Sequence, residues 1–411
     1  PTPHPGGLCG RRWGRIEETF GEDPHLVARM GVAYVRGLQG AEPSEGVSAT
    51  PKHFVGHGAG EGGRNRSSVQ VGERALREVH LRPFEAAVRE AGAESVMNAY
   101  HDVDGVPCAG DERLLTDVLR GEWGFDGTVV SDYHSVRFLR DEHGVAATAR
   151  EAAVRALEAG LDVELPLVEC YDELGGAVAD GDLAEATVDA AVRRVLRQKV
   201  EKGLFEAPAP DPGAVADAFG PDANREHARR LARASLTLLT NDGTLPLDDP
   251  DSVAVVGPKA DSPAGQVGDY AYAAHYPARE ATRRVVTPLA ALRDRLGEDR
   301  VAYAPGCTTT GPNRDGFDDA VAAVEGSDVA VAFVGARSAV ALATADGEVP
   351  AADAAPGAVP DAPTSGEGAD VVDLSLPGVQ GDLLAALAAT DVPLVVVLVS
   401  GKPHAVPELH E

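Results

Sequence analysis

The chain has 411 residues, of which 44% are hydrophobic and 25% are charged, which is the composition of a soluble globular protein. Its length predicts two or three domains rather than one. The 37 basic and 65 acidic side chains give a formal net charge of −28. A field of this sign repels phosphate groups, so it argues against nucleic acid or a phosphorylated substrate as a partner, while a neutral ligand is unaffected.

Cysteine usage and hydropathy exclude further classes. The four cysteines stand alone with no CxxC pair, which argues against a disulfide framework and against structural zinc held by thiolates. No apolar run approaches the roughly 18 residues of a membrane-spanning helix, so we expect no membrane partner. The first residues lack the pattern of a secretory signal peptide, which favours a cytoplasmic location for the sequence as it stands.

The first half of the sequence alternates strand and helix patterns. Short strand patterns begin near positions 48, 94, 127 and 160, and a further strand is expected between residues 31 and 37. Amphipathic helical patterns separate them, in units of ~30 to 45 residues, which predicts a parallel sheet with crossover helices. Polar residues gather where the strands end, as in a (β/α)8 barrel, although the strand patterns are fewer than eight.

The polar residues at these strand ends are Lys52, His53, Asn98, Tyr100 and Asp132. Asp132 follows an apolar strand, where an aspartate either faces a cleft as a reactive carboxylate or caps the next helix. Lys52 and His53 suit hydrogen bonding to the hydroxyls of a sugar, and the alternative for the histidine is a core residue bonded to backbone.

The histidines also raise a metal hypothesis. His53 and His57 have the HxxxH spacing of a zinc site. Gly56, however, breaks the helix that this spacing requires, and no third ligand stands out nearby. A zinc hydrolase is therefore the weaker interpretation, and it would lose activity with a chelator.

An aromatic and a cation stand together near the start of the chain, at Trp13 and Arg15. A tryptophan suits stacking on the face of a sugar, and an arginine suits bonding to its hydroxyls. The alternative is a solvated start of a helix, because Glu17 and Glu18 follow directly and acidic residues favour the first helical turn.

The second half begins after a proline-rich stretch at 206–213, which cannot form a helix or a central strand. It contains three continuous Val/Ala runs, SVAVVG, DVAVAFVG and PLVVVLVSG, which predict strands buried on both faces in a doubly wound α/β domain. Residues 339–370 are rich in Ala, Pro, Asp and Gly and predict a long loop, of the kind that is often functional.

Glu367 lies in this loop between Gly366 and Gly368, which leave its carboxyl unshielded and able to reach a cleft. The alternative is an exposed loop glutamate. The rival carboxylates of the same loop are Glu348, Asp361 and Asp370. A nucleotide-binding loop is not supported anywhere, since the nearest glycine cluster reads EGG rather than GxGxxG.

Seven segments occur in a characteristic order: RRWGRIEETFGEDPHLVARMG, TPKHFVGHGAGEGGRN, SVMNAYHDVDGVPC, LLTDVLRGEWGFDGTVVSDYHSV, ARASLTLLTNDGTLPL, SGEGADVVDLSLPG and VPLVVVLVSGKPHAV. In this order they resemble glycoside hydrolase family 3, the β-glucosidase and β-xylosidase family. The resemblance covers about residues 11 to 406. It departs from the family where GRRWGR replaces DPRWGR and where EGADV replaces EGxDR, and no residue matches a further sugar-binding aspartate upstream of WGR.

The resemblance implies a (β/α)8 barrel followed by an α/β sandwich domain, with the active site between them. It implies that Asp132 is the nucleophile and Glu367 the acid/base of a retaining exo-β-glycosidase that forms a covalent glycosyl-aspartate. No metal and no cofactor is implied. The terminal sugar of a β-linked oligosaccharide, or of an aryl or alkyl glycoside, would be held by Arg15, Lys52, His53, Met97, Tyr100 and Tyr133.

The same resemblance sets the expected domain limits. We predict an incomplete barrel domain at 1–205, a linker at 206–224 and a partial sandwich domain at 225–411 that carries the acid/base loop. The chain thus resembles a fragment that lacks the start of the barrel and the end of the second domain, and we expect it to be poorly stable alone, because open sheet edges are exposed.

Alternatives stay open from the sequence. A non-catalytic sugar-binding relic is consistent with a truncated chain, and a related branch of the family acts on β-N-acetylglucosaminides. That branch carries a His-Asp pair after a KHFPG-like motif, and the KHFVGHGAG of this chain lacks that continuation. The terminal sugar stays open between glucose, xylose, arabinose and galactose. Tyr133 stands where many glucosidases have Trp, which leaves the xylosidase option open. A homo-oligomer is neither indicated nor excluded.

Overall fold

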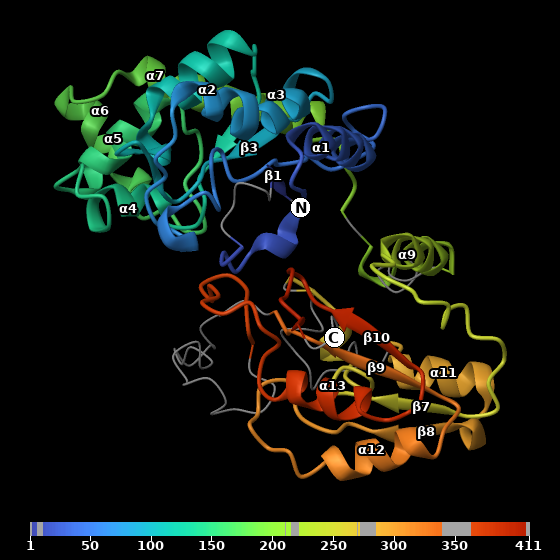
Figure 1. The fold of residues 1–411 in the computed structure, drawn as a ribbon. Coiled ribbons are helices and arrows are strands. Elements are labelled where there is room, and N and C mark those ends of the chain that lie inside the picture. Colours follow the sequence, from blue (N-terminus) through green and yellow to red (C-terminus); the bar gives the residue numbers. More distant parts are fainter. Residues whose placement is uncertain are drawn as a thin grey trace.

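Two α/β units follow one another along the chain, with helix α9 (Asp222–Ser235) between them (Figure 1). The computed structural model describes residues 2–5, 11–209, 211–214, 222–268, 270–271, 285–338 and 363–407. Helix α9 has no buried residue and lies apart from both sheets, so it contributes little to either core. The two-domain α/β architecture that the sequence predicts is confirmed.

In the first unit, four parallel chain segments lie side by side in sequence order. Strands β3 (Ser95–Met97) and β6 (Thr128–Val130) pair in parallel, and parallel bridges extend this pairing from Phe54 to Asn98 and from Val130 to Val163. These segments are the four expected near positions 48, 94, 127 and 160. Because they are parallel, their carboxyl ends meet at one edge.

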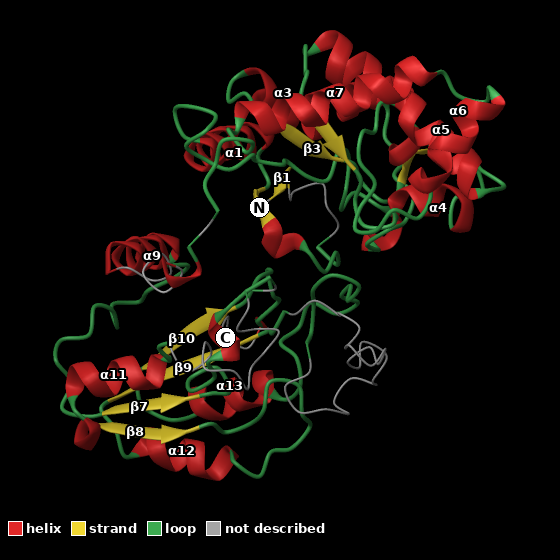
Figure 2. Cartoon of the chain, turned by 180° about the vertical axis from the view of Figure 1, so that it is seen from behind, coloured by secondary structure: helices red, strands yellow, loops and turns green. Residues whose placement is uncertain are grey.

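The remaining elements of this unit are mostly helices packed outside these strands (Figure 2). Its other strands are β1 (Thr2–Pro5), β2 (Thr19–Gly21), β4 (Asp102–Val103) and β5 (Val106–Pro107). Its helices are α1 (Pro24–Gln39), α2 (Glu73–Ala75), α3 (Arg82–Arg89), α4 (Ser135–Asp141), α5 (Ala149–Ala159), α6 (Leu174–Asp180) and α7 (Glu185–Glu201), with π-helical turns at Leu76–Leu81 and Arg113–Glu122.

The strand expected between residues 31 and 37 is wrong, because these residues lie inside helix α1. Asp23 caps that helix by accepting the backbone N–H of His25 at 2.7 Å, and Pro24 occupies its first turn. The buried residues of the helix recur at helical spacing along one face. Read alone, the short run of Val, Ala and Tyr at its centre imitates a strand.

A buried carboxylate ties the outer elements to the strands. Asp162, which is 8% exposed, accepts the backbone N–H of Val129 on β6 at 2.8 Å. The same side chain pairs with Arg120 at 2.8 Å and with Arg194 of α7 at 2.7 Å. With two cations and a backbone donor, its buried charge is compensated, so this cluster fixes α7 against β6.

The second unit is a parallel four-stranded sheet with the order β10-β9-β7-β8. Its strands are β7 (Val253–Val256), β8 (Val301–Ala304), β9 (Val329–Gly335) and β10 (Leu394–Val399). Helix α11 (Pro288–Leu296) packs on one face, and α12 (Phe317–Glu325) and α13 (Gln380–Ala388) pack on the other. The doubly wound arrangement and the three Val/Ala strands are confirmed. The expected burial on both faces holds for β7 and β9 but is wrong for β10, an edge strand that is only partly buried, and β8 was not predicted.

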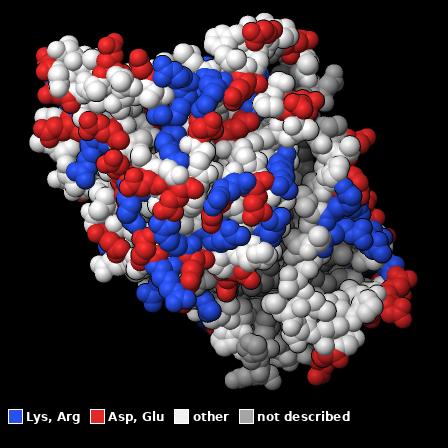
Figure 3. Space-filling view, turned by 90° about the horizontal axis from the view of Figure 1, so that it is seen from above, with Lys and Arg blue, Asp and Glu red and all other residues white. Residues whose placement is uncertain are grey.

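Basic and acidic side chains are interspersed on the face seen in Figure 3. Arg77, for example, pairs with both Glu73 and Glu122. Among the described residues, no helix is both long and apolar enough to cross a membrane. The described cysteines, Cys108, Cys170 and Cys307, are buried.

Candidate active site

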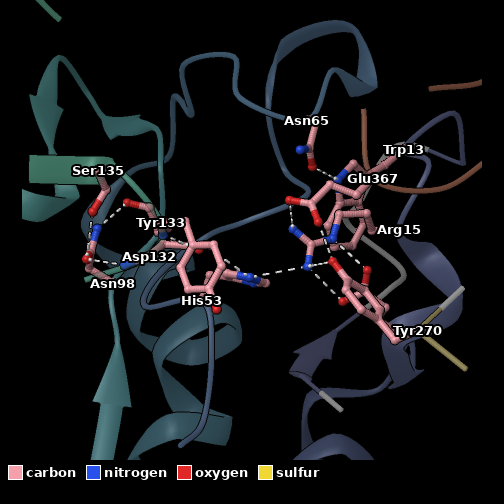
Figure 4. A network of polar contacts seen from close by, with 12 residues as sticks. Trp13, Arg15, His53, Asn65, Asn98, Asp132, Tyr133, Ser135, Tyr270 and Glu367 are labelled. Carbon is pink, nitrogen blue, oxygen red and sulfur yellow. Dashed lines mark hydrogen bonds and ion pairs between the residues drawn. The ribbon is translucent and has the colours of Figure 1, made fainter. Parts of the chain in front are cut away.

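The candidate site lies where the strand ends of the first unit meet a loop of the second. Asp132 lies on one side of it and Glu367 on the other, with His53 and Arg15 between them (Figure 4). His53 and Arg15 therefore link the two carboxyl groups that the sequence singles out. The two residues are 235 positions apart in the sequence. The site exists only because the two units pack together.

Asp132 is held by backbone groups at the carboxyl end of β6. Its N–H donates to Asn98 Oδ1 at 3.1 Å, and its own Oδ1 accepts the N–H of Tyr133 at 2.7 Å. Its Oδ2 lies 3.3 Å from His53 Nε2. Asn98 is fully buried and also accepts a hydrogen bond from the hydroxyl of Ser135, so it anchors the turn that presents Asp132. The side chain caps its own turn and faces the site as well.

Burial raises the pKa of Asp132 to about 6, because the charged carboxylate is removed from water. The backbone N–H of Tyr133, the hydroxyl of Tyr100 and the charges of Lys52 and Arg15 oppose this rise. Lys52 thus favours the carboxylate form, but it does not outweigh burial. The carboxyl is ionised above about pH 6 and is neutral well below it.

Arg15 is the central cation of the site, and its side chain is 1% exposed. Its Nε and Nη2 donate to the two carboxylate oxygens of Glu18 at 2.6 and 2.9 Å, and its Nη1 donates to Glu367 Oε1 at 3.1 Å. Burial disfavours its charge, but the hydrogen bond and charge of Glu18, followed by the charge of Glu367, outweigh burial and raise the pKa of Arg15. A charged Arg15 therefore holds Glu367 in place.

Glu367 reaches the site from a loop of the second unit, and its side chain is 27% exposed. The flanking Gly366 and Gly368 adopt φ of 142° and 78°, which residues with a side chain rarely adopt. This backbone turns the glutamate toward Arg15. The hydroxyl of Tyr270 donates to Glu367 Oε2, so both carboxyl oxygens have protein partners.

An interdomain clasp, formed by Gly14, Asn65 and Asp370, holds the Glu367 loop against the first unit. Asp370 Oδ1 accepts the N–H of Gly14 at 2.9 Å, and its Oδ2 accepts the N–H of Asn65 at 2.8 Å. Next to it, Val371 donates its N–H to the carbonyl of Arg12 at 2.6 Å. Both oxygens of Asp370 are thus used to bind backbone, which is a structural task.

The structure brings the other predicted site residues to the same region. Lys52 Nζ lies 5.4 Å from the centre of the Tyr270 ring, and the Tyr100 hydroxyl lies close enough to Asp132 for the two to affect each other's ionisation. Met97 ends β3 in register with Val130 of β6. Tyr133 is 53% exposed beside Asp132. Their roles toward a sugar stay predictions.

The expectation that Trp13 stacks on a sugar is not supported, because Trp13 is fully buried. Its Nε1 donates to Asn65 Oδ1 at 3.0 Å, and its ring packs edge-on against His57 with centroids 5.1 Å apart. Trp13 therefore forms part of the wall that supports Arg15. The alternative of a solvated helix start is wrong as well, since Glu18 pairs with Arg15.

Three further residues of the site escaped the sequence analysis in part or in full. Glu18 lies three positions after Arg15, a spacing at which side chains of one helical turn meet, so this pair was open to prediction. Asp370 was considered only as a rival acid. Tyr270 gave no signal, because it lies outside every motif and reaches the site only through the fold.

A metal centre finds no support among the residues that the structure describes, where no group of three or more His, Cys, Asp or Glu side chains could hold an ion. His53 and His57 pack ring against ring, with centroids 4.3 Å apart. The rings of Tyr100 and His101 and the carboxylate of Asp132 lie beside them, but these side chains do not form a group that could hold an ion. Of the rival loop carboxylates, Glu348 and Asp361 lie outside the described residues.

Family models match both units. A model of the glycosyl hydrolase family 3 N-terminal domain matches residues 10–198, and one of the C-terminal domain of the same family matches residues 236–411. A beta-xylosidase of Formosa agariphila is 38% identical over 95% of this chain and 53% of its own length. A periplasmic beta-glucosidase of Salmonella typhimurium is 33% identical over 96% of this chain and 51% of its own length.

Solved structures agree with this result. A β-glucosidase from Erythrobacter marinus matches with a TM-score of 0.84 and 34% identity, over 100% of this chain and 55% of that one. A β-glucosidase from Listeria innocua, solved in complex with isofagomine, matches with a TM-score of 0.85 and 31% identity, over 100% of this chain and 53% of that one. The chain spans about half the length of the relatives that it matches.

Proposed function

The chain belongs to glycosyl hydrolase family 3, and from this premise we propose that it is a retaining exo-β-glycosidase with Asp132 as nucleophile and Glu367 as acid/base. The observation that carries the proposal is the placement of these two carboxyl groups, one from each unit, around Arg15 and His53. Retaining hydrolysis needs two carboxyl groups in different roles.

In the first step, the ionised Asp132 attacks the anomeric carbon of the terminal sugar. We assign the attack to Oδ2, since Oδ1 accepts the N–H of Tyr133. An ester bond forms between Asp132 and the sugar, the glycosidic C–O bond breaks, and Glu367 gives its proton to the leaving oxygen.

In the second step, Glu367 accepts a proton from water, which attacks the same carbon and breaks the ester bond. The sugar leaves with its original β configuration, because two inversions have occurred, and Asp132 returns to its ionised state. His53 and Lys52, which lie beside Asp132, are proposed to bind the sugar hydroxyls, together with Arg15, Met97, Tyr100 and Tyr133. No step needs a metal or a cofactor.

The proposed domain limits follow the same reasoning. We retain 1–205 for the barrel domain, 206–224 for the linker and 225–411 for the domain that carries Glu367. The proposed substrates are terminal β-D-glucosides or β-D-xylosides, which is supported by the names of relatives that act on each class, a beta-glucosidase and a beta-xylosidase.

The function is tested with aryl β-D-glucoside and aryl β-D-xyloside, with the anomeric form of the first sugar product followed by proton NMR. We expect hydrolysis of at least one, with the β anomer released first and the α anomer appearing later by mutarotation. Release of the α anomer first contradicts the retaining mechanism. Failure of the chain to hydrolyse either glycoside, or equal turnover by Asp132→Asn, supports a sugar-binding relic instead.

The pH dependence of kcat/KM should show an acid limb near pH 6. The pKa of Asp132 is raised to about 6, and a carboxylic acid is nucleophilic only when ionised, so activity falls as the pH drops through this value. Lys52→Met should move the limb to higher pH, because a positive charge that favours the carboxylate is lost. The measurement is a pH profile of kcat/KM for the two proteins.

The matched control for this profile is Lys199→Met, which removes an exposed lysine from α7 and should leave the limb unchanged. Loss of sugar binding through Lys52 lowers the height of the profile without moving its limb, so the two effects of the substitution are separable. An acid limb near pH 4, or one that is insensitive to Lys52→Met, contradicts the assignment of the limb to Asp132.

A further inference from the structure

Tyr270 is the one residue of the polar network in Figure 4 that comes from the segment between β7 and α11. Its hydroxyl accepts a hydrogen bond from Arg15 Nη2 at 3.1 Å and donates one to Glu367 Oε2. Arg15 also donates to Glu367 Oε1, so the three side chains form a closed ring of hydrogen bonds. In this ring each oxygen of the carboxyl has a different partner.

Two cations hold the aromatic ring of Tyr270 in place. The Arg15 guanidinium lies 5.7 Å and Lys52 Nζ lies 5.4 Å from the ring centre, distances at which cations are attracted to aromatic rings. Tyr270 is 50% exposed, so it is not a core residue, and these contacts with the site account for its orientation. The position of the hydroxyl is therefore set by residues of the first unit.

The hydroxyl is protonated at neutral pH. Burial of the group raises the pKa of Tyr270 above its usual value, and the carboxylates of Glu18 and Glu367 raise it further, while Arg15 opposes them. A hydroxyl can also reverse its role, because it has one hydrogen to donate and lone pairs that accept. A guanidinium can only donate.

The difference between a hydroxyl and a guanidinium is important for Glu367, because the proposed mechanism requires its carboxyl group in both the protonated and the ionised state. When Glu367 is a carboxylate, the Tyr270 hydroxyl donates to Oε2, as the structure shows. When Glu367 carries a proton on Oε2, the hydroxyl can rotate and accept it, whereas a fixed donor would be opposed to that proton. Gly366 and Gly368 leave the loop backbone permissive, so side-chain partners have to define the orientation of the carboxyl.

We propose that Tyr270 is a positioning residue that orients the Glu367 carboxyl in both its acid and its base form. The inference rests on the proposed function, in which Glu367 is the acid/base. The proposal gives the second unit a residue that acts on the Glu367 carboxyl. It also distinguishes the role of Tyr270 from that of a residue that binds the sugar.

The test compares Tyr270→Phe with the parent on a series of aryl β-glycosides, from dinitrophenyl to phenyl. The substitution keeps the ring that contacts Lys52 and Arg15 and removes only the hydroxyl. We expect kcat/KM to fall on the order of 30-fold for the phenyl glycoside, which needs protonation of its leaving oxygen, and less than about 3-fold for the dinitrophenyl glycoside, which does not. Melting temperatures should stay within a few degrees of each other.

Tyr303→Phe is the matched control, because it removes a tyrosine hydroxyl from β8 of the same unit, away from Glu367, and it should leave the whole series unchanged. An equal loss for every leaving group, or a rise in KM alone, means that Tyr270 only binds substrate and overturns the proposal. Unchanged kinetics of Tyr270→Phe overturn it as well.

A crystal structure of each protein gives a readout that does not depend on turnover. We expect a single conformer of Glu367 in the parent, with Oε2 on Tyr270, and more than one conformer in Tyr270→Phe. One unchanged conformer in Tyr270→Phe contradicts the proposal even when the kinetics cannot be measured. If the parent hydrolyses no glycoside but Tyr270→Phe shows the expected additional conformers, the proposed function is wrong. The contact by which Tyr270 orients Glu367 is then still supported.

Discussion

Asp132→Asn should reduce turnover by at least ~10³-fold, because an amide cannot form the glycosyl ester on which the two-step mechanism depends. Asparagine has nearly the same shape as aspartate, and its Oδ1 can still accept the N–H of Tyr133. The loss is therefore chemical rather than structural. It is measured as kcat on an aryl β-glycoside, beside Asp180→Asn, which changes an exposed carboxylate on α6 and should retain parent activity.

The same substitution should increase stability above pH 6. In the unfolded chain the carboxyl has its ordinary pKa of 3.8, and burial raises the folded value to about 6. The folded state therefore binds its proton more tightly, and the ionised side chain costs roughly 3 kcal/mol at pH 8 that is absent below about pH 4. Urea unfolding should show Asp132→Asn more stable than the parent at pH 8, with the difference vanishing at pH 4.

A covalent label locates the nucleophile directly. An activated 2-deoxy-2-fluoro glycoside should form a stable adduct with the parent, since the fluorine slows both formation and hydrolysis of the ester, and the activated leaving group accelerates only its formation. Peptide mass mapping should place the adduct on Asp132. An adduct on another carboxylate contradicts the assignment, whatever the effect of Asp132→Asn on turnover.

Glu367→Ala should reduce hydrolysis of phenyl β-glycosides by ~10² to 10⁴-fold, because both the proton for the leaving oxygen and the base for water are lost. Activated dinitrophenyl glycosides should still react with Asp132 and then stall as the glycosyl ester. Azide needs no base, so its addition should restore turnover and release a β-glycosyl azide. The products are identified by NMR.

Asp370→Ala is the informative control for azide rescue, since Asp370 lies three residues away on the same loop. Its two oxygens accept the N–H groups of Gly14 and Asn65, so its loss should weaken the docking of the loop rather than remove a proton donor. Azide should therefore not restore its activity. Rescue of Asp370→Ala or of Glu348→Ala, with Glu367→Ala unaffected, contradicts the assignment of the acid/base.

Much of the fold could be predicted from local patterns. Buried parallel strands are continuous runs of Val and Ala, and three of the four strands of the second unit have this signature. Strand β8 does not, because it reads VAYA, in which Ala302 is exposed and the half-buried Tyr303 interrupts the run of Val and Ala. The strand predicted at residues 31–37 is part of helix α1. The prediction was wrong because the apolar residues there form a short run that resembles a strand pattern.

Residues of the candidate site could be predicted from the sequence only where a local motif indicates their chemical role. Asp132 comes at the end of a strand, and Glu367 stands between two glycines, but position left an alternative open for each, and the resemblance to the family motifs implied their roles. The full burial of Trp13 depends on packing against His57 and Asn65, which are distant in the sequence, and the approach of Tyr270 depends on how the two units dock. No local period or spacing encodes that packing or that docking, so these features required the structure.

Gly14 gives the docking of the two units a consequence for their evolution. A Cβ atom at this position would lie 2.2 Å from the carbonyl oxygen of Gly366 and 2.4 Å from that of Ala369. Both neighbours are main-chain atoms, so no change of side chain in the second unit can make room for one at position 14. If the first unit is joined to the second unit of another protein, both Gly14 and the backbone path of the loop at Gly366 and Ala369 must therefore be preserved. A substitution at position 14 of the first unit is therefore constrained by the backbone of the second.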